Sequence, residues 1–143
     1  MRGLMPRVTS ILCFAGVLLF LLGLMTGFAV PALKAPRIGL SAHVAATQMG
    51  VALIAFGFLW ERLTFWRGWS APLAHVLWIS FYLVWAALVL GGFWGTGKVL
   101  PIAGAGHVAE RWQDQITMLP LALGSFASLG VVVLLLIQWR WKG

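Results

Sequence analysis

The stretch from Pro36 to Leu63, PRIGLSAHVAATQMGVALIAFGFLWERL, decides the fold of this chain. After Arg37 it runs through about twenty apolar or small residues, which is enough for a helix of about 1.5 Å per residue to cross a bilayer. One ionisable side chain, His43, lies inside this span. An ionisable side chain within a membrane span indicates a functional site, because its burial in lipid is costly. His43 is therefore the first candidate site residue.

One face of this helix is small and partly polar, because residues three and four apart lie on the same side of a helix. It consists of His43, Ala46, Thr47, Gly50, Ile54 and Gly57. Such a face leaves room for a large flat molecule, with the imidazole as its ligand. The alternative interpretation is a contact with another helix, in which His43 forms a hydrogen bond to its neighbour.

The composition of the whole chain indicates an integral membrane protein. Hydrophobic residues make up 62% of the 143 residues and charged residues only 9%, against roughly 25% charged residues in soluble domains. Apolar spans occupy about residues 8–30, 39–60, 72–93 and 116–139. We predict an all-α membrane protein, one domain over residues 1–143, with four transmembrane helices in an up-down bundle.

The charged residues bear on partners and orientation. The net charge of +7 fits contact with the lipid bilayer and its anionic head groups. The basic residues form no continuous stripe, so we expect no nucleic-acid partner. The side that holds both chain ends carries Arg2, Arg7, Arg62, Arg67, Arg140 and Lys142; the other side carries Lys34, Arg37, Lys98 and Arg111. This excess predicts cytoplasmic ends in a bacterial-type inner membrane.

The polar and aromatic residues of the loops are interpreted as membrane-surface residues. The loop Gly95–Gln115 contains His107, Glu110, Arg111 and Asp114. Their spacing of i, i+3, i+4 and i+7 predicts one polar face of a helical turn at the membrane surface, in preference to a metal site. In the loop before the third span, we expect Trp60, Trp66 and Trp69 to form an interfacial belt.

The polar side chains inside the spans are few and suit a flat apolar cofactor or an aromatic substrate. Besides His43 they include Gln48 and Tyr82, the only tyrosine. A buried tyrosine hydroxyl needs a partner, either a substrate or a structural acceptor. No phosphate-binding loop, dinucleotide fingerprint or Cys-x-x-Cys motif is present. A neutral imidazole is a usual axial ligand of haem iron.

The sequence resembles a family of small membrane isomerases that includes hydroxylaminobenzene mutase and, more distantly, styrene oxide isomerase. The resemblance rests on Leu18–Gly27 (LLFLLGLMTG), Pro36–Gly50 (PRIGLSAHVAATQMG) and Trp94–His107 (WGTGKVLPIAGAGH). It covers nearly the whole chain, and the residues around His43 are the most diagnostic part.

The resemblance implies a homotrimer with haem b at the subunit interfaces and His43 as the ligand of the iron. The small face, with Thr47 and Gly50, then forms one wall of the haem cleft. The implied activity is a redox-neutral rearrangement of a small aromatic substrate, either an epoxide to an aldehyde or an arylhydroxylamine to an aminophenol, with iron as Lewis acid. Tyr82 and Gln48 are the candidates for catalytic hydrogen bonds.

Two positions depart from the family pattern. Met49 stands where the family has an asparagine six residues after the histidine. Ala87 ends a Trp-Ala-Ala sequence where the family commonly has Trp-Ala-Asn. These departures leave open a second function, a non-catalytic haem- or small-molecule-binding membrane protein that serves as a sensor, carrier or scaffold.

Overall fold

A computed structural model describes residues 5–63, 65–66 and 68–138, all built from helices and connecting turns. The helices are α1 (Met5–Ala29), α2 (Pro36–Trp60), α3 (Ser70–Trp94) and α4 (Arg111–Ile137), with a short 3-10 helix η1 (Val30–Ala32). Each of the four α-helices is long and apolar enough to cross a membrane. The prediction of an all-α chain with four such helices is therefore confirmed.

Part of the orientation argument lies beyond these ranges. Arg2, Arg67, Arg140 and Lys142 lie outside the described residues, as does residue 139, where the fourth predicted span ends. The cytoplasmic location of the chain ends stays a prediction.

The helix ends follow from local sequence. Pro36 opens α2, where its missing N–H costs nothing. Gly95 closes α3 with φ of +75°, a left-handed conformation that favours glycine. Glu110 is the N-cap of α4 in a capping box, with its backbone N–H donating to Gln113 Oε1 over 2.9 Å. Because the helix begins only after this cap, the predicted helical face that starts at His107 is wrong.

Helices α1 and α2 pack backbone against backbone. A Cβ atom at Gly16 would lie 2.6 Å from the carbonyl oxygen of Gly50, and one at Gly23 would lie 2.9 Å from Ala46 Cβ. Contacts this short require glycine. Small residues give membrane helices this close approach, so the pair forms a tightly fitted unit.

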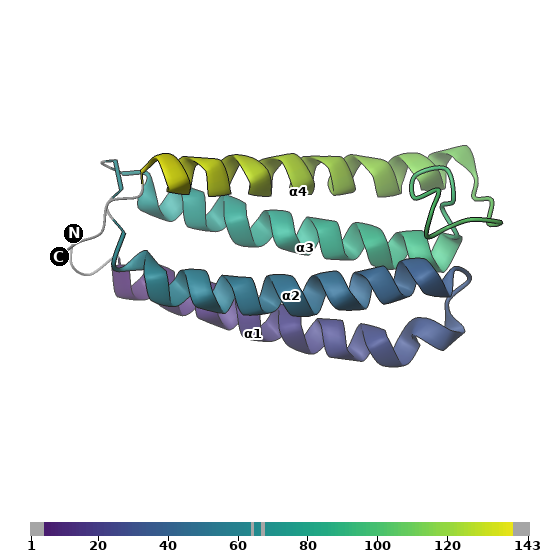
Figure 1. The fold of residues 1–143 in the computed structure, drawn as a ribbon, viewed down its shortest axis with the longest axis horizontal. Coiled ribbons are helices and arrows are strands. Elements are labelled where there is room, and N and C mark those ends of the chain that lie inside the picture. The colour runs from purple at the N-terminus through teal and green to yellow at the C-terminus, as the bar shows by residue number, and fades with distance from the viewer. Residues whose placement is uncertain (1–4, 64, 67, 139–143) are drawn as a thin grey trace.

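Helix α4 is attached differently. Among the described residues, no Cα atom of α4 lies within 8 Å of a Cα atom of α1 or α2. In Figure 1, α3 lies between α4 and α2. The two helices approach closely at Gly124, where a Cβ atom would lie 2.6 Å from the carbonyl oxygen of Ser80.

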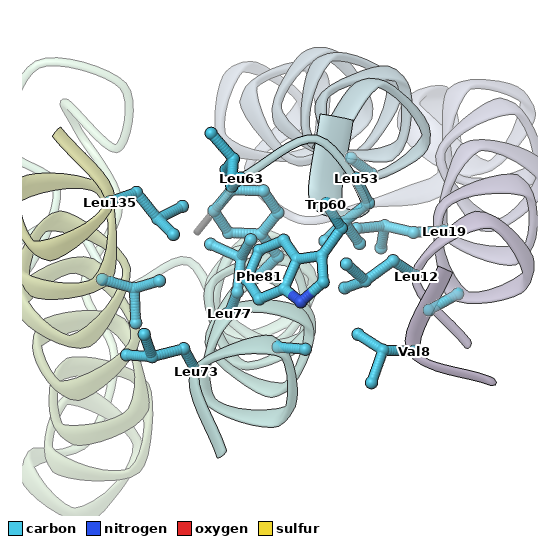
Figure 2. Close-up of a cluster of buried hydrophobic side chains, with 14 residues drawn as sticks. Val8, Leu12, Leu19, Leu53, Trp60, Leu63, Leu73, Leu77, Phe81 and Leu135 are labelled. Atoms are coloured by element: carbon cyan, nitrogen blue, oxygen red, sulfur yellow. The ribbon is translucent and has the colours of Figure 1, made fainter. Parts of the chain in front are cut away.

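The larger buried cluster surrounds Trp60, at the end where α2 finishes and α3 starts (Figure 2). The Trp60 ring is fully buried, stacks on Phe65 at 4.8 Å between centroids, and donates from Nε1 to Ser70 Oγ over 3.0 Å. Trp66 and Trp69 are about half exposed. The predicted interfacial belt is thus wrong for Trp60, which is a core residue because its N–H finds a partner inside the fold.

Candidate functional site

His43 lies in the second turn of α2 and leans against α1. Its Nδ1 atom is 2.8 Å from the carbonyl oxygen of Gly23, and the side chain is half-buried. A carbonyl oxygen only accepts hydrogen bonds, so Nδ1 carries the proton and donates. In the neutral ring, Nε2 then keeps its lone pair. Nε2 has no hydrogen-bond partner in the described part of the chain.

Gly27 makes this ring position possible. A Cβ atom at Gly27 would lie 2.8 Å from Nδ1 and 3.0 Å from Cε1 of His43. Any larger residue would therefore displace the imidazole from α1. The sequence signal for this contact was the pair Gly23 and Gly27, four residues apart, which predicts close helix packing but does not identify the partner.

The small face of α2 is the contact surface for α1. A Cβ atom at Gly50 would lie 2.7 Å from Gly16 O, and Thr47 Cγ2 lies 3.0 Å from the Cβ position of Gly23. The Thr47 hydroxyl donates within α2, to the carbonyl oxygens of His43 and Val44 at 3.0 Å each. Within the chain, α1 fills the space beside this face, and the role of Thr47 and Gly50 in a haem cleft stays a prediction.

A second face of α2 is exposed, and it adjoins His43. This stripe includes Leu40, Val44, Gln48, Val51 and Phe58, whose side chains are exposed in the described part of the chain. Gln48 brings an unpartnered amide, within the described residues, into an otherwise apolar surface. It follows His43 by five residues, about 7.5 Å along the axis and about 140° around it.

Tyr82 lies elsewhere on the bundle. Its hydroxyl donates to the carbonyl oxygen of Ala15 over 2.8 Å. Ala15 and Gly23, the α1 partners of Tyr82 and His43, are eight residues apart, or about 12 Å along α1. The structure therefore does not bring Tyr82 and His43 together within one chain.

An aromatic row on α3 holds α1 in place near His43. The rings of Trp78 and Tyr82 are 5.8 Å apart between centroids, and those of Tyr82 and Trp85 are 6.5 Å apart. Trp85 Nε1 donates to Thr26 Oγ1 over 3.1 Å, and Thr26 is the neighbour of Gly27. Helix α1 is thus fixed by α2 and α3 at the same level, which is where it contacts the imidazole.

The two positions that depart from the family pattern face the interior. Met49 is half-buried and packs against both hydrophobic clusters, and Ala87 is fully buried. Met49 lies about 120° from His43 around the helix. Met49 therefore does not share the helical face of the imidazole.

The donor set suits one kind of metal group. The described residues contain no cluster of three His, Cys, Asp or Glu side chains that could hold a metal ion by themselves. A single imidazole with a free Nε2 is, however, a usual protein ligand of haem iron, since the porphyrin supplies four further nitrogens. His43 fits this role.

The fold and the site define a four-helix membrane-type protein that presents one oriented imidazole at the edge of an exposed helical stripe. The sequence model of the styrene oxide isomerase family matches residues 8–140, and the chain belongs to that family. The expected family resemblance is thus confirmed.

Two characterised relatives are mutases from Ectopseudomonas oleovorans. Hydroxylaminobenzene mutase HabB is 37% identical over 122 residues, which cover 85% of this chain and 74% of the relative. Hydroxylaminobenzene mutase HabA is 35% identical over 103 residues, which cover 71% and 76% respectively. No solved structure matches the chain.

Proposed function

We propose that this chain is a haem-b-dependent membrane isomerase that rearranges a small aromatic substrate without net oxidation or reduction. The family and the relatives are named for isomerase and mutase reactions, on styrene oxide and on hydroxylaminobenzene. The observation that carries the haem assignment is His43, with Nδ1–H bonded to Gly23 O and Nε2 free.

In this proposal, the hydrogen bond from His43 to Gly23 O prepares the imidazole to bind iron. A histidine that binds a metal through one ring nitrogen usually donates its other N–H to a carbonyl or carboxylate, which fixes the tautomer and makes the ligand more basic. The α1 backbone does this for His43. When bound, the haem would supply a Lewis-acidic iron that activates an oxygen or nitrogen function of the substrate.

The surroundings of His43 support a site between subunits. Helix α1 fills the small face of α2, so a cofactor would reach His43 from the exposed stripe beside it, which carries Val44 and Gln48. A second copy of the chain would cover this stripe and enclose the cofactor. We therefore propose the homotrimer implied by the family resemblance. In each subunit, the four helices would cross a bacterial inner membrane in alternating directions, with both chain ends in the cytoplasm.

Within this site, Gln48 is the residue we propose for a hydrogen bond to the substrate. Its amide is exposed on the stripe and can both donate and accept. Tyr82 remains a predicted catalytic residue, although its hydroxyl would first have to leave Ala15 O.

The experiment is a turnover assay with haem-loaded protein in detergent, using styrene oxide and phenylhydroxylamine. We expect the aldehyde or the aminophenol to form, and Gln48→Leu to lower kcat/KM roughly tenfold through the lost hydrogen bond. Gln115→Leu, an exposed glutamine on α4, is the matched control. If neither substrate reacts, the proposed isomerase activity with these two substrate classes is wrong.

The second candidate is a non-catalytic haem-binding membrane protein, such as a sensor or carrier. The apolar, interior positions of Met49 and Ala87 favour it, because they remove polar groups that the family pattern places on α2 and α3. Retention of haem without product from either substrate class would support this alternative.

A further inference from the structure

Three buried side chains from the segments where α3 ends and α4 begins each carry an oxygen atom that has no partner in the described part of the chain. Thr96 and Thr117 are fully buried, and Asp114 is only 9% exposed. Within the described residues, Thr96 Oγ1, Thr117 Oγ1 and Asp114 Oδ1 form no hydrogen bond. Buried polar atoms in folded proteins nearly always have a partner, and an exception often marks a bound water or ion.

Two of these side chains, Thr96 and Thr117, meet at Gly91. A Cβ atom at Gly91 would lie 2.9 Å from Thr96 Oγ1 and 3.3 Å from Thr117 Cγ2. Asp114 precedes Thr117 by three residues, so both lie on the same face of α4. That face is buried against α3, the helix that α4 contacts. Ile38 of α2 lies close to the same place, with Cγ2 3.4 Å from the same Cβ position.

The charges around this cluster leave the carboxylate of Asp114 unbalanced. Asp114 forms no ion pair with any residue that the structure describes. Lys34, the nearby base on the α1–α2 connection, donates from Nζ to Val108 O over 3.1 Å at the surface. Arg111, one turn before Asp114, is exposed. The N-terminal end of α4 favours a carboxylate, but this effect is smaller than the cost of burying an unpaired charge.

We propose that Asp114, Thr96 and Thr117 bind a monovalent alkali cation, sodium or potassium. All three offer oxygen, the donor that hard cations prefer, and a single carboxylate balances a single positive charge. Calcium sites usually contain more carboxylates. The C-terminal end of α3 adds partial negative charge at the same place, and helix ends coordinate sodium in this way in membrane transporters. The site is separate from His43 and does not depend on the proposed function.

The test is the thermal unfolding temperature of the full-length protein in detergent, followed by tryptophan fluorescence. Sodium chloride, potassium chloride and choline chloride are compared at equal ionic strength. We expect one or both alkali cations to raise Tm saturably, by roughly 5 °C well above their dissociation constant. Equal Tm values in all three salts would overturn the proposal, and a gain specific to magnesium or calcium would overturn its assignment to a monovalent ion.

Two variants locate the effect. Asp114→Asn is expected to abolish the alkali-specific rise in Tm, whereas Glu61→Gln, the same chemical change at an exposed acid, keeps it. Thr117→Val preserves shape and charge, and we expect it to raise the half-saturating cation concentration several-fold. A full cation effect in Asp114→Asn would place the ion elsewhere. If that variant does not fold, the salt comparison on the wild-type protein and the Thr117→Val variant still test the proposed cation site.

Discussion

The α1–α2 pair and the α3–α4 pair have similar composition but are held together differently. Glycines bring the α1 and α2 backbones into contact at Gly16, Gly23 and Gly50, and the comparable backbone contact between α3 and α4 is at Gly124. Among the described residues, α3 is the one helix with Cα atoms within 8 Å of those of α4, and only 17% of the apolar span of α4 is buried, against 44% for α3. The comparison shows where the fold needs exact positions. The helix that holds His43 meets α1 at several glycines along its length, whereas α4 presents most of its surface outward.

The largest effect is expected where the α1–α2 contact is closest. In Gly50→Ala, the new Cβ would lie 2.7 Å from both Gly16 O and Phe20 N, which are backbone atoms that cannot yield. We expect a loss of about 1–3 kcal/mol in the free energy of unfolding, or no folded protein. Gly130→Ala on α4 is the matched control, since nothing lies within 4 Å of its Cβ position. Equal unfolding midpoints for both variants would show that α1 and α2 are not in backbone contact.

Next in size is Gly27→Ala, which pushes the His43 ring away from Gly23 O. Loss of such an outer hydrogen bond typically weakens metal binding about 10- to 100-fold, so haem affinity measured by titration is expected to fall by at least tenfold. Gly57→Ala is the control, because its new Cβ atom would meet Cys13 in the same helix pair but far from His43. It separates displacement of the ring from a general weakening of the α1–α2 contact. A similar decrease of haem affinity in both variants would mean that haem affinity does not depend on the position of the His43 ring.

A smaller effect is expected for Tyr82→Phe. The change removes one hydrogen bond between α3 and α1, to Ala15 O, and a typical bond contributes about 0.5–1.5 kcal/mol. Unfolding in a denaturing detergent measures the loss in the free energy of unfolding. Ser128→Ala, which removes an exposed hydrogen bond within α4, is the control. Unchanged stability combined with lost turnover would instead place the hydroxyl at the substrate.

The smallest effect is expected on the outer face of α4. Phe126 is 75% exposed, and surface substitutions away from special features usually change stability by less than about 0.5 kcal/mol. We expect Phe126→Ala to leave both the unfolding midpoint and the oligomeric mass in detergent unchanged. Dissociation of the oligomer would show that α4, and not the exposed stripe of α2, lies between subunits.

Hydropathy and length were sufficient to predict four helices and a histidine within one of them. They were not sufficient to predict what that histidine touches. A small face indicates close contact but does not say with what, so α1 could not be distinguished from a cofactor. The burial of Trp60 depends on Ser70 and Phe65, which approach it only in three dimensions. Asp114 was assigned to a loop because the predicted span began at residue 116, whereas the cap at Glu110 starts the helix at Arg111.

The most direct test of His43 as the haem ligand is the absorption spectrum of the haem-loaded protein. With His43 as the ligand, the wild-type protein shows a Soret band that shifts or disappears in His43→Ala and returns when imidazole is added. Thr47→Val, which alters a neighbouring residue that bonds within its own helix, is expected to keep the wild-type band. A Soret band unchanged by His43→Ala, or a wild-type protein that binds no haem, would contradict the assignment.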